Sequence, residues 1–138
     1  MTDMQSEPLP APAVFLTPRR GGRKFAIEFM SLANQKCKPC EAGASPLSGT
    51  RADELLAGIP GWKIADGSIV REFTFKNYYE TTAFVNAVVW IAHREDHHPD
   101  IRFGYKTCRI TYSTHSIGGL SENDFICAAK INALLPPP

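Results

Sequence analysis

All four histidines of this 138-residue chain fall within one short stretch: His93, His97, His98 and His115. Imidazole has an unperturbed pKa of about 6.5, so it can donate and accept protons near neutral pH. Several imidazoles around one cavity therefore suit acid–base catalysis. Asp96 precedes the adjacent pair and is a carboxylate that could orient one of these rings. We expect Asp96, the adjacent pair and His115 to share one functional site.

The adjacent pair lies where a helix is expected to end. A capping pattern at Asn77 predicts the start of this helix, and apolar residues from Phe84 to Ala92 recur at helical spacing. Pro99 disfavours helix in the residue before it, so the helix should end near Asp96. A proline-fixed turn then frees both histidines from helix packing. His93 falls inside the helix and is typical of a residue near its end.

The rest of the chain alternates short strands and helices. Four runs have the alternation or the hairpin signals of strands: residues 62–64, 69–75, 101–103 and 106–112. Thr50 with Asp53, and Ser121 with Asp124, resemble capping boxes that start two further helices. The order of elements predicts an α+β fold, a four-stranded antiparallel sheet with three helices packed on one face. The other face would then be an apolar surface that forms subunit contacts.

The composition fits one soluble globular domain. Hydrophobic residues make up 43% of the chain and charged residues 21%, which is enough for a single core. The net charge of +1 gives no general attraction for nucleic acid or anionic lipid. No apolar run approaches the roughly 20 residues that cross a bilayer, and the N-terminus lacks a secretory signal. We therefore expect a cytoplasmic protein that binds neither nucleic acid nor membrane, with free thiols at its four cysteines.

Three segments are expected along the chain. Residues 1–30 contain several prolines and no sustained period, which predicts a disordered leader, or a non-native one if translation begins at Met30. Residues 31–48 form a segment that contains Pro, Gly and the two cysteines Cys37 and Cys40. Residues 49–138 form the main domain.

The spacing of the chemically active residues resembles the signature of pterin-4a-carbinolamine dehydratases. The matching positions are His93, His97, His98, Pro99, Tyr105, His115 and Asp124. Similarity continues through Pro60-Gly61-Trp62 and covers the chain from about Cys37 to Leu135. The resemblance implies the same four-stranded α+β fold, assembled as a homodimer or homotetramer. It also implies dehydration of 4a-hydroxytetrahydropterin to quinonoid dihydropterin and water, in the recycling pathway that supports aromatic amino-acid hydroxylases.

The resemblance also assigns roles to residues. It implies that His97 and His98 are the acid–base pair, and that His115 binds the pterin substrate or completes proton transfer. The remaining positions would bind or orient the substrate or a histidine: Asp96, Pro99, Trp62, Asp124 and His93. A proton donor and a proton acceptor are sufficient for this chemistry, so we expect no metal and no organic cofactor. Many members have a carboxylate at the position of His93 and an aromatic residue at that of Ile101, and this chain departs from the family there.

Two other functions are compatible with these patterns. Proteins of this fold also resemble non-catalytic dimerisation or assembly factors, although retention of the three family histidines favours the enzyme. His93 and His97 have the i, i+4 spacing of metal ligands on a helix, and Cys37 and Cys40 have a Cys-x-x-Cys spacing. There is no second cysteine pair of this kind and no His-Glu-x-x-His pattern, so the metal interpretation is the weaker one.

Overall fold

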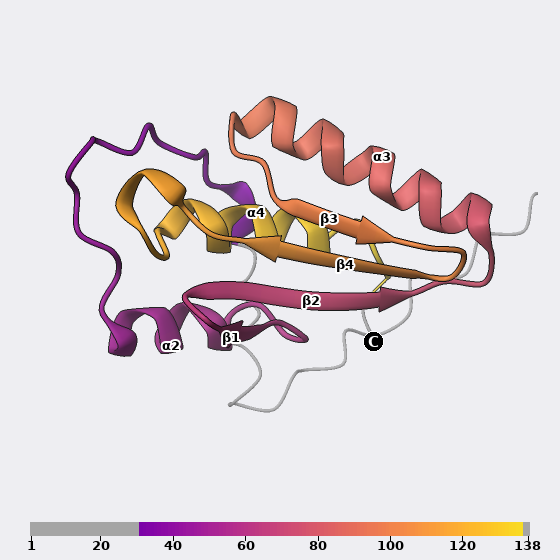
Figure 1. The fold of residues 1–138 in the computed structure, drawn as a ribbon, viewed down its shortest axis with the longest axis horizontal. Helices are drawn as coiled ribbons and strands as arrows, with labels where there is room; N and C mark the ends of the chain where they lie inside the picture. Colours follow the sequence, from indigo (N-terminus) through magenta and orange to yellow (C-terminus); the bar gives the residue numbers. More distant parts are fainter. Residues whose placement is uncertain (1–30, 137–138) are drawn as a thin grey trace, which may run out of the picture.

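The computed structural model describes residues 31–136, so the predictions for residues 1–30 lie outside the described range. Within that range the chain forms three α-helices of at least nine residues and four strands (Figure 1). The helices are α2 (Gly49–Ala57), α3 (Tyr78–Glu95) and α4 (Glu122–Asn132), and the strands are β1 (Lys63–Ala65), β2 (Ser68–Thr74), β3 (Asp100–Phe103) and β4 (Thr107–Tyr112). A short 3₁₀ helix, η1 (His115–Ile117), follows β4. The predicted fold class is confirmed.

The four strands form one antiparallel sheet in the order β1-β2-β4-β3. The β1–β2 hairpin turns at Asp66 and Gly67, whose φ angles of 49° and 70° are the left-handed values that a type I′ turn requires. The predicted hairpin is therefore confirmed. β4 pairs with β2 on one side and β3 on the other, so it is a central strand, and the chain reaches His115 shortly after it.

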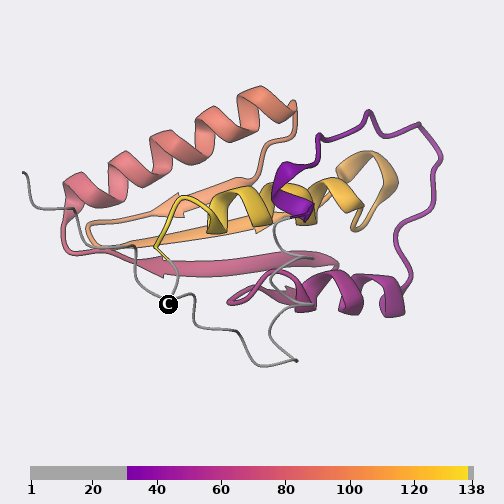
Figure 2. The same ribbon diagram turned by 180° about the vertical axis from the view of Figure 1, so that it is seen from behind.

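The helices cover one face of the sheet, which is the face seen in Figure 2. On this face β4 contributes the buried side chains of Cys108, Ile110 and Tyr112. Phe73 of β2 packs against Phe84 of α3, with their ring centroids 4.7 Å apart. This packing brings the end of α3, the end of β4 and the start of α4 to the same end of the molecule (Figure 1).

Two helix starts test the capping predictions. Asn77 accepts a hydrogen bond from the Glu80 backbone N–H at 3.0 Å, so the predicted start of α3 is confirmed. The prediction that Thr50 caps α2 is wrong, because the side chain of Ser48 accepts the Arg51 backbone N–H at 3.3 Å. The helix therefore begins earlier, and Thr50 lies inside its first turn.

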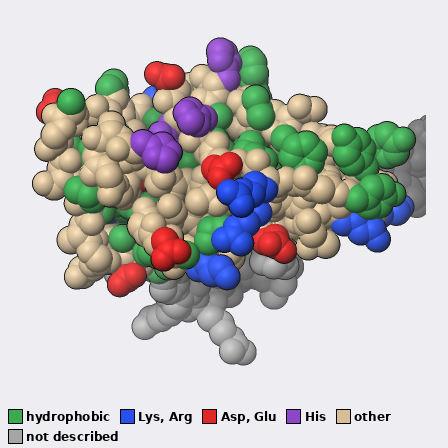
Figure 3. All heavy atoms as spheres, viewed as in Figure 1, with side chains coloured by type: hydrophobic (Ala, Val, Ile, Leu, Met, Phe, Trp, Pro, Cys, Tyr) green, Lys and Arg blue, Asp and Glu red, His purple; other side chains and the backbone are tan. Residues whose placement is uncertain are grey.

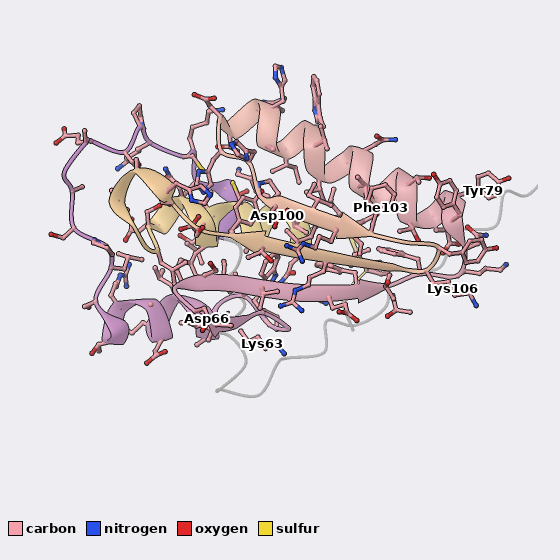
Figure 4. The ribbon with its side chains drawn as sticks, in the orientation of Figure 1. Lys63, Asp66, Tyr79, Asp100, Phe103 and Lys106 are labelled. Atoms are coloured by element: carbon pink, nitrogen blue, oxygen red, sulfur yellow. The ribbon has the colours of Figure 1, made fainter. Side chains whose placement is uncertain are left out.

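The sheet face without helices is polar. Apart from Val70, Ala65 and Ser68, the side chains that the strand register places on this face are charged or threonine: Lys63, Glu72, Thr74, Asp100, Arg102, Thr107, Arg109 and Thr111. Lys and Arg side chains extend across this face in Figure 3, and Figure 4 shows Lys63 and Asp100 on its two outer strands. The prediction of an apolar free face is therefore wrong. Water is sufficient to cover a face of this composition.

Most of the large exposed apolar side chains of the described residues lie instead on α3 and on the β3–β4 hairpin: Tyr78, Tyr79, Val89, Trp90, Phe103 and Tyr105, with Ile64 and Leu134 elsewhere. The Tyr78 and Tyr105 rings stack with their centroids 6.5 Å apart. Figure 4 labels Tyr79 and Lys106 at the end of the molecule where α3 begins and the β3–β4 hairpin turns, and α3 finishes at the opposite end. None of the described helices is both long enough and apolar enough to cross a membrane.

Candidate active site

His97 directly follows Asp96, a residue in a left-handed backbone conformation at which α3 ends. Asp96 has φ 50° and ψ 41°, a conformation that ends the helix directly after Glu95 and turns the chain away from its axis. The predicted helix end is confirmed. Because the turn lies between them, His93 and His97 do not share a helical face, although their spacing is i, i+4.

The ring of His97 is held by two neighbours. Its Nε2–H donates a hydrogen bond to Oδ1 of Asp124 at 2.7 Å. The ring also stacks on Tyr112, with centroids 5.4 Å apart and planes 15° apart. The side chain is 13% exposed, so it is largely immobilised. Since Asp124 engages Nε2, Nδ1 is the nitrogen that His97 can offer to a substrate.

Asp124 is fully buried near the start of α4. Its second carboxylate oxygen, Oδ2, accepts hydrogen bonds from the Thr114 hydroxyl and the Ser121 backbone N–H, both at 2.9 Å. The predicted capping box of Ser121 and Asp124 is confirmed. One carboxylate therefore caps α4 through one oxygen and orients His97 through the other, which compensates the burial of its charge.

Opposing influences set the pKa of His97. Burial lowers it, because a charged imidazole loses hydration. The hydrogen bond from His97 to Asp124 and the charge of that carboxylate raise it, with further contributions from the charges of Cys127 and Asp96. The net result is a raised pKa, so His97 retains its proton at a higher pH than an ordinary histidine does.

The other histidines lie on the surface. His98 is exposed in the turn before β3, and His115 is exposed at the start of η1. Figure 3 shows histidine side chains gathered on this part of the molecule. His93 is exposed on α3, where its ring centroid lies 5.3 Å from that of Trp90. The structure thus places His98 in the turn directly after His97, and His115 in the turn directly after Thr114.

The remaining predicted residues have different surroundings. Asp96 is exposed, and the carboxylate in contact with an imidazole is Asp124 instead. Pro99 is half-buried between the turn and β3. Trp62 belongs to the core, because it is 6% exposed and its indole N–H donates to Oδ1 of Asn132 at 2.8 Å. This placement supports a packing role for Trp62.

A cavity of about 360 Å³ opens beside His97. Its walls come from the end of α3, from Thr114 and Ser116 after β4, and from residues 36–40, which we call the strap. The strap belongs to the indigo segment that passes the end of α3 before it runs to α2 (Figure 1). The lining includes His97 but neither His98 nor His115. The N-terminal segment therefore forms part of the candidate site.

Two buried side chains hold the strap in place. The Asn123 side chain donates to the Lys38 carbonyl at 2.7 Å and accepts the Lys38 N–H at 3.0 Å. Oε2 of Glu95 accepts the Cys37 N–H at 2.9 Å, and Oε1 of Glu95 lies 3.5 Å from Nζ of Lys130. Because Glu95 is the last residue of α3 and Asn123 lies in the first turn of α4, the strap is fastened to both helices.

Glu95 and Asn123 were not predicted as site residues. Glu95 lies seven positions after Val88 on the buried stripe of α3, and a carboxylate in such a position indicates a buried, partnered charge. That signal is readable in the sequence. Asn123 and Lys38 lie 85 positions apart, and no local pattern indicates that they meet.

Among residues 31–136, no three His, Cys, Asp or Glu side chains are grouped closely enough to hold a metal ion. The two cysteines of the Cys-x-x-Cys segment have different neighbours. Sγ of Cys37 lies 3.6 Å from Sγ of Cys127, whereas Sγ of Cys40 accepts a hydrogen bond from Asn123 at 3.5 Å. This arrangement does not favour the metal interpretation of these cysteines.

The fold and the site define an α+β domain whose cavity adjoins a carboxylate–imidazole pair able to transfer protons. A family-wide sequence profile described as Pterin 4 alpha carbinolamine dehydratase matches residues 45–134. A protein named pterin-4-alpha-carbinolamine dehydratase from Nitrosomonas eutropha is 61% identical over 105 residues, which cover 75% of this chain and 93% of the relative. A protein of the same name from Nitrosomonas europaea is 60% identical over 104 residues, which cover 75% and 92%.

A solved structure resembles this chain as well. The crystal structure of a transcriptional coactivator/pterin dehydratase from Brucella melitensis superposes with a TM-score of 0.63 at 32% sequence identity, over 65% of this chain and 98% of that one. The chain belongs to the pterin-4a-carbinolamine dehydratase family. The family resemblance predicted from the histidine spacing is therefore confirmed.

Proposed function

We propose that His97, His98 and His115 carry out the reaction of this chain, which is that of its family, pterin-4a-carbinolamine dehydratase, a hydro-lyase. The substrate is a 4a-hydroxytetrahydropterin, and the products are quinonoid dihydropterin and water. The bond between C4a and the hydroxyl oxygen breaks, and N5 loses its proton as a C4a–N5 double bond forms. The departing hydroxide needs a proton donor and N5 needs a proton acceptor.

The observation that carries the proposal is the 2.7 Å hydrogen bond between His97 and the buried Asp124, beside the cavity. Asp124 raises the pKa of His97, so this ring is suited to be the proton donor. In this assignment Nδ1–H of His97 protonates the hydroxyl as it leaves. Asp124 keeps the ring oriented and stabilises its charged form.

The two exposed histidines complete the assignment. His98 is next to the donor in the chain, and we assign to it the proton of N5. His115 lies on the other turn at this end of the molecule, and we assign it to binding of the pterin. Asp96 adds negative charge near His97, and Pro99 fixes the turn that carries His98. His93 departs from the family pattern, and we assign it no proton transfer.

We also propose the cellular setting that the family implies. The quinonoid product would return to the tetrahydropterin pool that supports aromatic amino-acid hydroxylation in the cytoplasm. The chain would act as a homodimer or homotetramer. The exposed Val89 and Trp90 on the outer face of α3 favour such an assembly, because burial of large apolar side chains is a driving force for association.

The test is a direct assay of the purified chain with chemically made 4a-hydroxytetrahydropterin. We expect saturable acceleration of dehydration, followed by the absorbance of the quinonoid product, at the same rate with and without a metal chelator. A rate equal to the uncatalysed one, in protein shown to be folded, would leave the non-catalytic assembly factor as the better account.

A further inference from the structure

The strap carries a cysteine that meets a second cysteine from α4. Sγ of Cys37 lies 3.6 Å from Sγ of Cys127, although the two residues are 90 positions apart in the chain. Cys127 is fully buried on α4, one helical turn after Asp124. Cys37 is half-buried and lines the cavity. The two sulfurs therefore connect the outer wall of the candidate active site to the helix that carries its carboxylate.

The two thiols are close to covalent bonding distance. Sulfurs in a disulfide are about 2.05 Å apart, so the pair would have to approach by about 1.5 Å from its present contact. The strap belongs to no helix or sheet, so this approach breaks no hydrogen bond of a helix or sheet, and the bonds that must adjust are those of Glu95 and Asn123 to the strap backbone. The same hydrogen bonds keep Cys37 beside α4.

The other two cysteines have different positions. Cys40 accepts a hydrogen bond from the Asn123 side chain, and Cys108 is buried in β4 between the neighbouring strands β2 and β3. The pair in contact is therefore not the one that the Cys-x-x-Cys spacing indicates. The thiol next to Cys37 is Cys127, which is distant in sequence.

We propose that Cys37 and Cys127 are an oxidisable pair whose disulfide fastens the strap to α4. With a small disulfide such as oxidised glutathione, Cys37 loses its proton to water when the strap opens, and its thiolate attacks one sulfur and displaces one glutathione thiolate. When the strap closes, Cys127 loses its proton and its thiolate attacks the Cys37 sulfur, and the second glutathione leaves as a thiolate that takes up a proton. The protein loses two electrons and two protons, and the oxidised glutathione is reduced to two thiols.

In the closed strap the hydrogen bond to Cys127 and burial raise the pKa of Cys37, so Cys37 stays a thiol until the strap opens. The surroundings of Cys127 suit the second step. The hydrogen bond from the Cys37 thiol lowers the pKa of Cys127, burial opposes this effect, and the charge of His97 lowers the pKa further. The attacking species in disulfide exchange is the thiolate. Once Cys37 has reacted, its thiol no longer donates to Cys127, so the charge of His97 is then the largest influence that favours the Cys127 thiolate against burial.

The test uses the full chain in glutathione buffers that range from reducing to oxidising, with acid quenching, alkylation, intact mass measurement and peptide mapping. All four cysteines should be alkylated in the reduced protein. Oxidation should remove two alkylation sites and yield one linked peptide pair, Cys37 with Cys127, and reduced glutathione should reverse it. Cys40→Ser is the matched control and should behave as wild type, whereas Cys37→Ser should form no internal disulfide. A Cys37–Cys40 linkage, or four alkylated thiols in every buffer, would overturn the proposal.

A second measurement tests what the disulfide does to the strap. Lys36 is exposed next to Cys37, so trypsin should cut after it when the strap detaches. The disulfide should slow this cleavage by about tenfold or more, because proteolysis requires local opening. Cys37→Ser should be cut at the same rate in both buffers. Equal rates for oxidised and reduced wild type would contradict the proposal, and neither measurement depends on dehydratase activity.

Discussion

Replacing Asp124 with Asn removes the charge that His97 depends on and keeps the side chain nearly the same size. Oδ1 of Asp124 accepts the His97 ring N–H, and Oδ2 accepts the Thr114 hydroxyl and the Ser121 N–H. An amide has only one acceptor oxygen, so its NH₂ group must face either His97 or the other two donors. Asp124→Asn therefore leaves one side of this buried network without an acceptor.

The magnitudes follow from that loss. An unsatisfied group in a buried network, together with a weakened helix cap, should lower the free energy of unfolding by about 2–4 kcal/mol. Burial then becomes the main influence on the ring, so the pKa of His97 should fall and the ring should be neutral at neutral pH. A neutral ring is a poor proton donor, and kcat should fall by about 10²- to 10⁴-fold.

The assay measures kcat against pH at a temperature where melting curves show that the variant is folded. The plot of wild-type kcat against pH should have an alkaline limb, in which kcat falls as the pH rises through the raised pKa of His97. In Asp124→Asn this limb should lie at lower pH. Glu122→Gln is the matched control, because Glu122 lies in the same turn of α4 but forms an exposed ion pair with Arg51. A folded Asp124→Asn protein with wild-type kcat and an unmoved limb would refute the reasoning.

Three further predictions concern the strap, pH and assembly. Asn123→Ala removes both hydrogen bonds to the Lys38 backbone and should raise KM by about five- to thirtyfold with little change in kcat, whereas an unchanged KM would mean that the strap does not contact substrate. The raised pKa of His97 contributes stability that is fully present below about pH 6.5 and is lost as the pH rises through the pKa of the folded state. The free energy of unfolding measured with urea should therefore decrease over this pH range in wild type and not in His97→Ala. An equal decrease in both proteins would contradict the pairing with Asp124. Trp90 is 60% exposed on α3, and Trp90→Glu should lower the oligomer mass in sedimentation equilibrium, so an unchanged mass would place the interface elsewhere.

Local signals in the sequence predicted most of the elements. The Asp66 and Gly67 turn, the Asn77 cap and the effect of Pro99 each act within a few residues, so the hairpin and both ends of α3 follow from short patterns. The prediction that Thr50 caps α2 was wrong because Ser48, two positions upstream, is an equally good cap. The polar free face could have been predicted, since Thr107, Arg109 and Thr111 alternate with the core residues of β4.

The site was only partly predictable, because its decisive contacts join distant parts of the chain. The capping pattern correctly predicted Asp124 as a cap, but its second contact reaches His97, 27 positions away. Asp96 was the expected partner because it is adjacent in sequence, yet it is exposed. Residues of the strap contact Asn123 and Cys127, which lie 85 and 90 positions away from them in the chain, and no local or periodic sequence pattern predicts either contact.

Turnover of the three single variants His97→Ala, His98→Ala and His115→Ala tests the central claim most directly. Acid–base catalysis predicts that each loses about ten- to ten-thousandfold in kcat per folded molecule, and that His93→Ala is milder. The melting temperature should be preserved in the exposed His98→Ala and His115→Ala, whereas His97→Ala should melt lower because Asp124 loses a hydrogen bond. Rings on one proton-transfer path act as a unit, so the His97→Ala, His98→Ala double variant should lose less than the product of the single losses. Wild-type turnover in all three single variants would contradict the catalytic assignment.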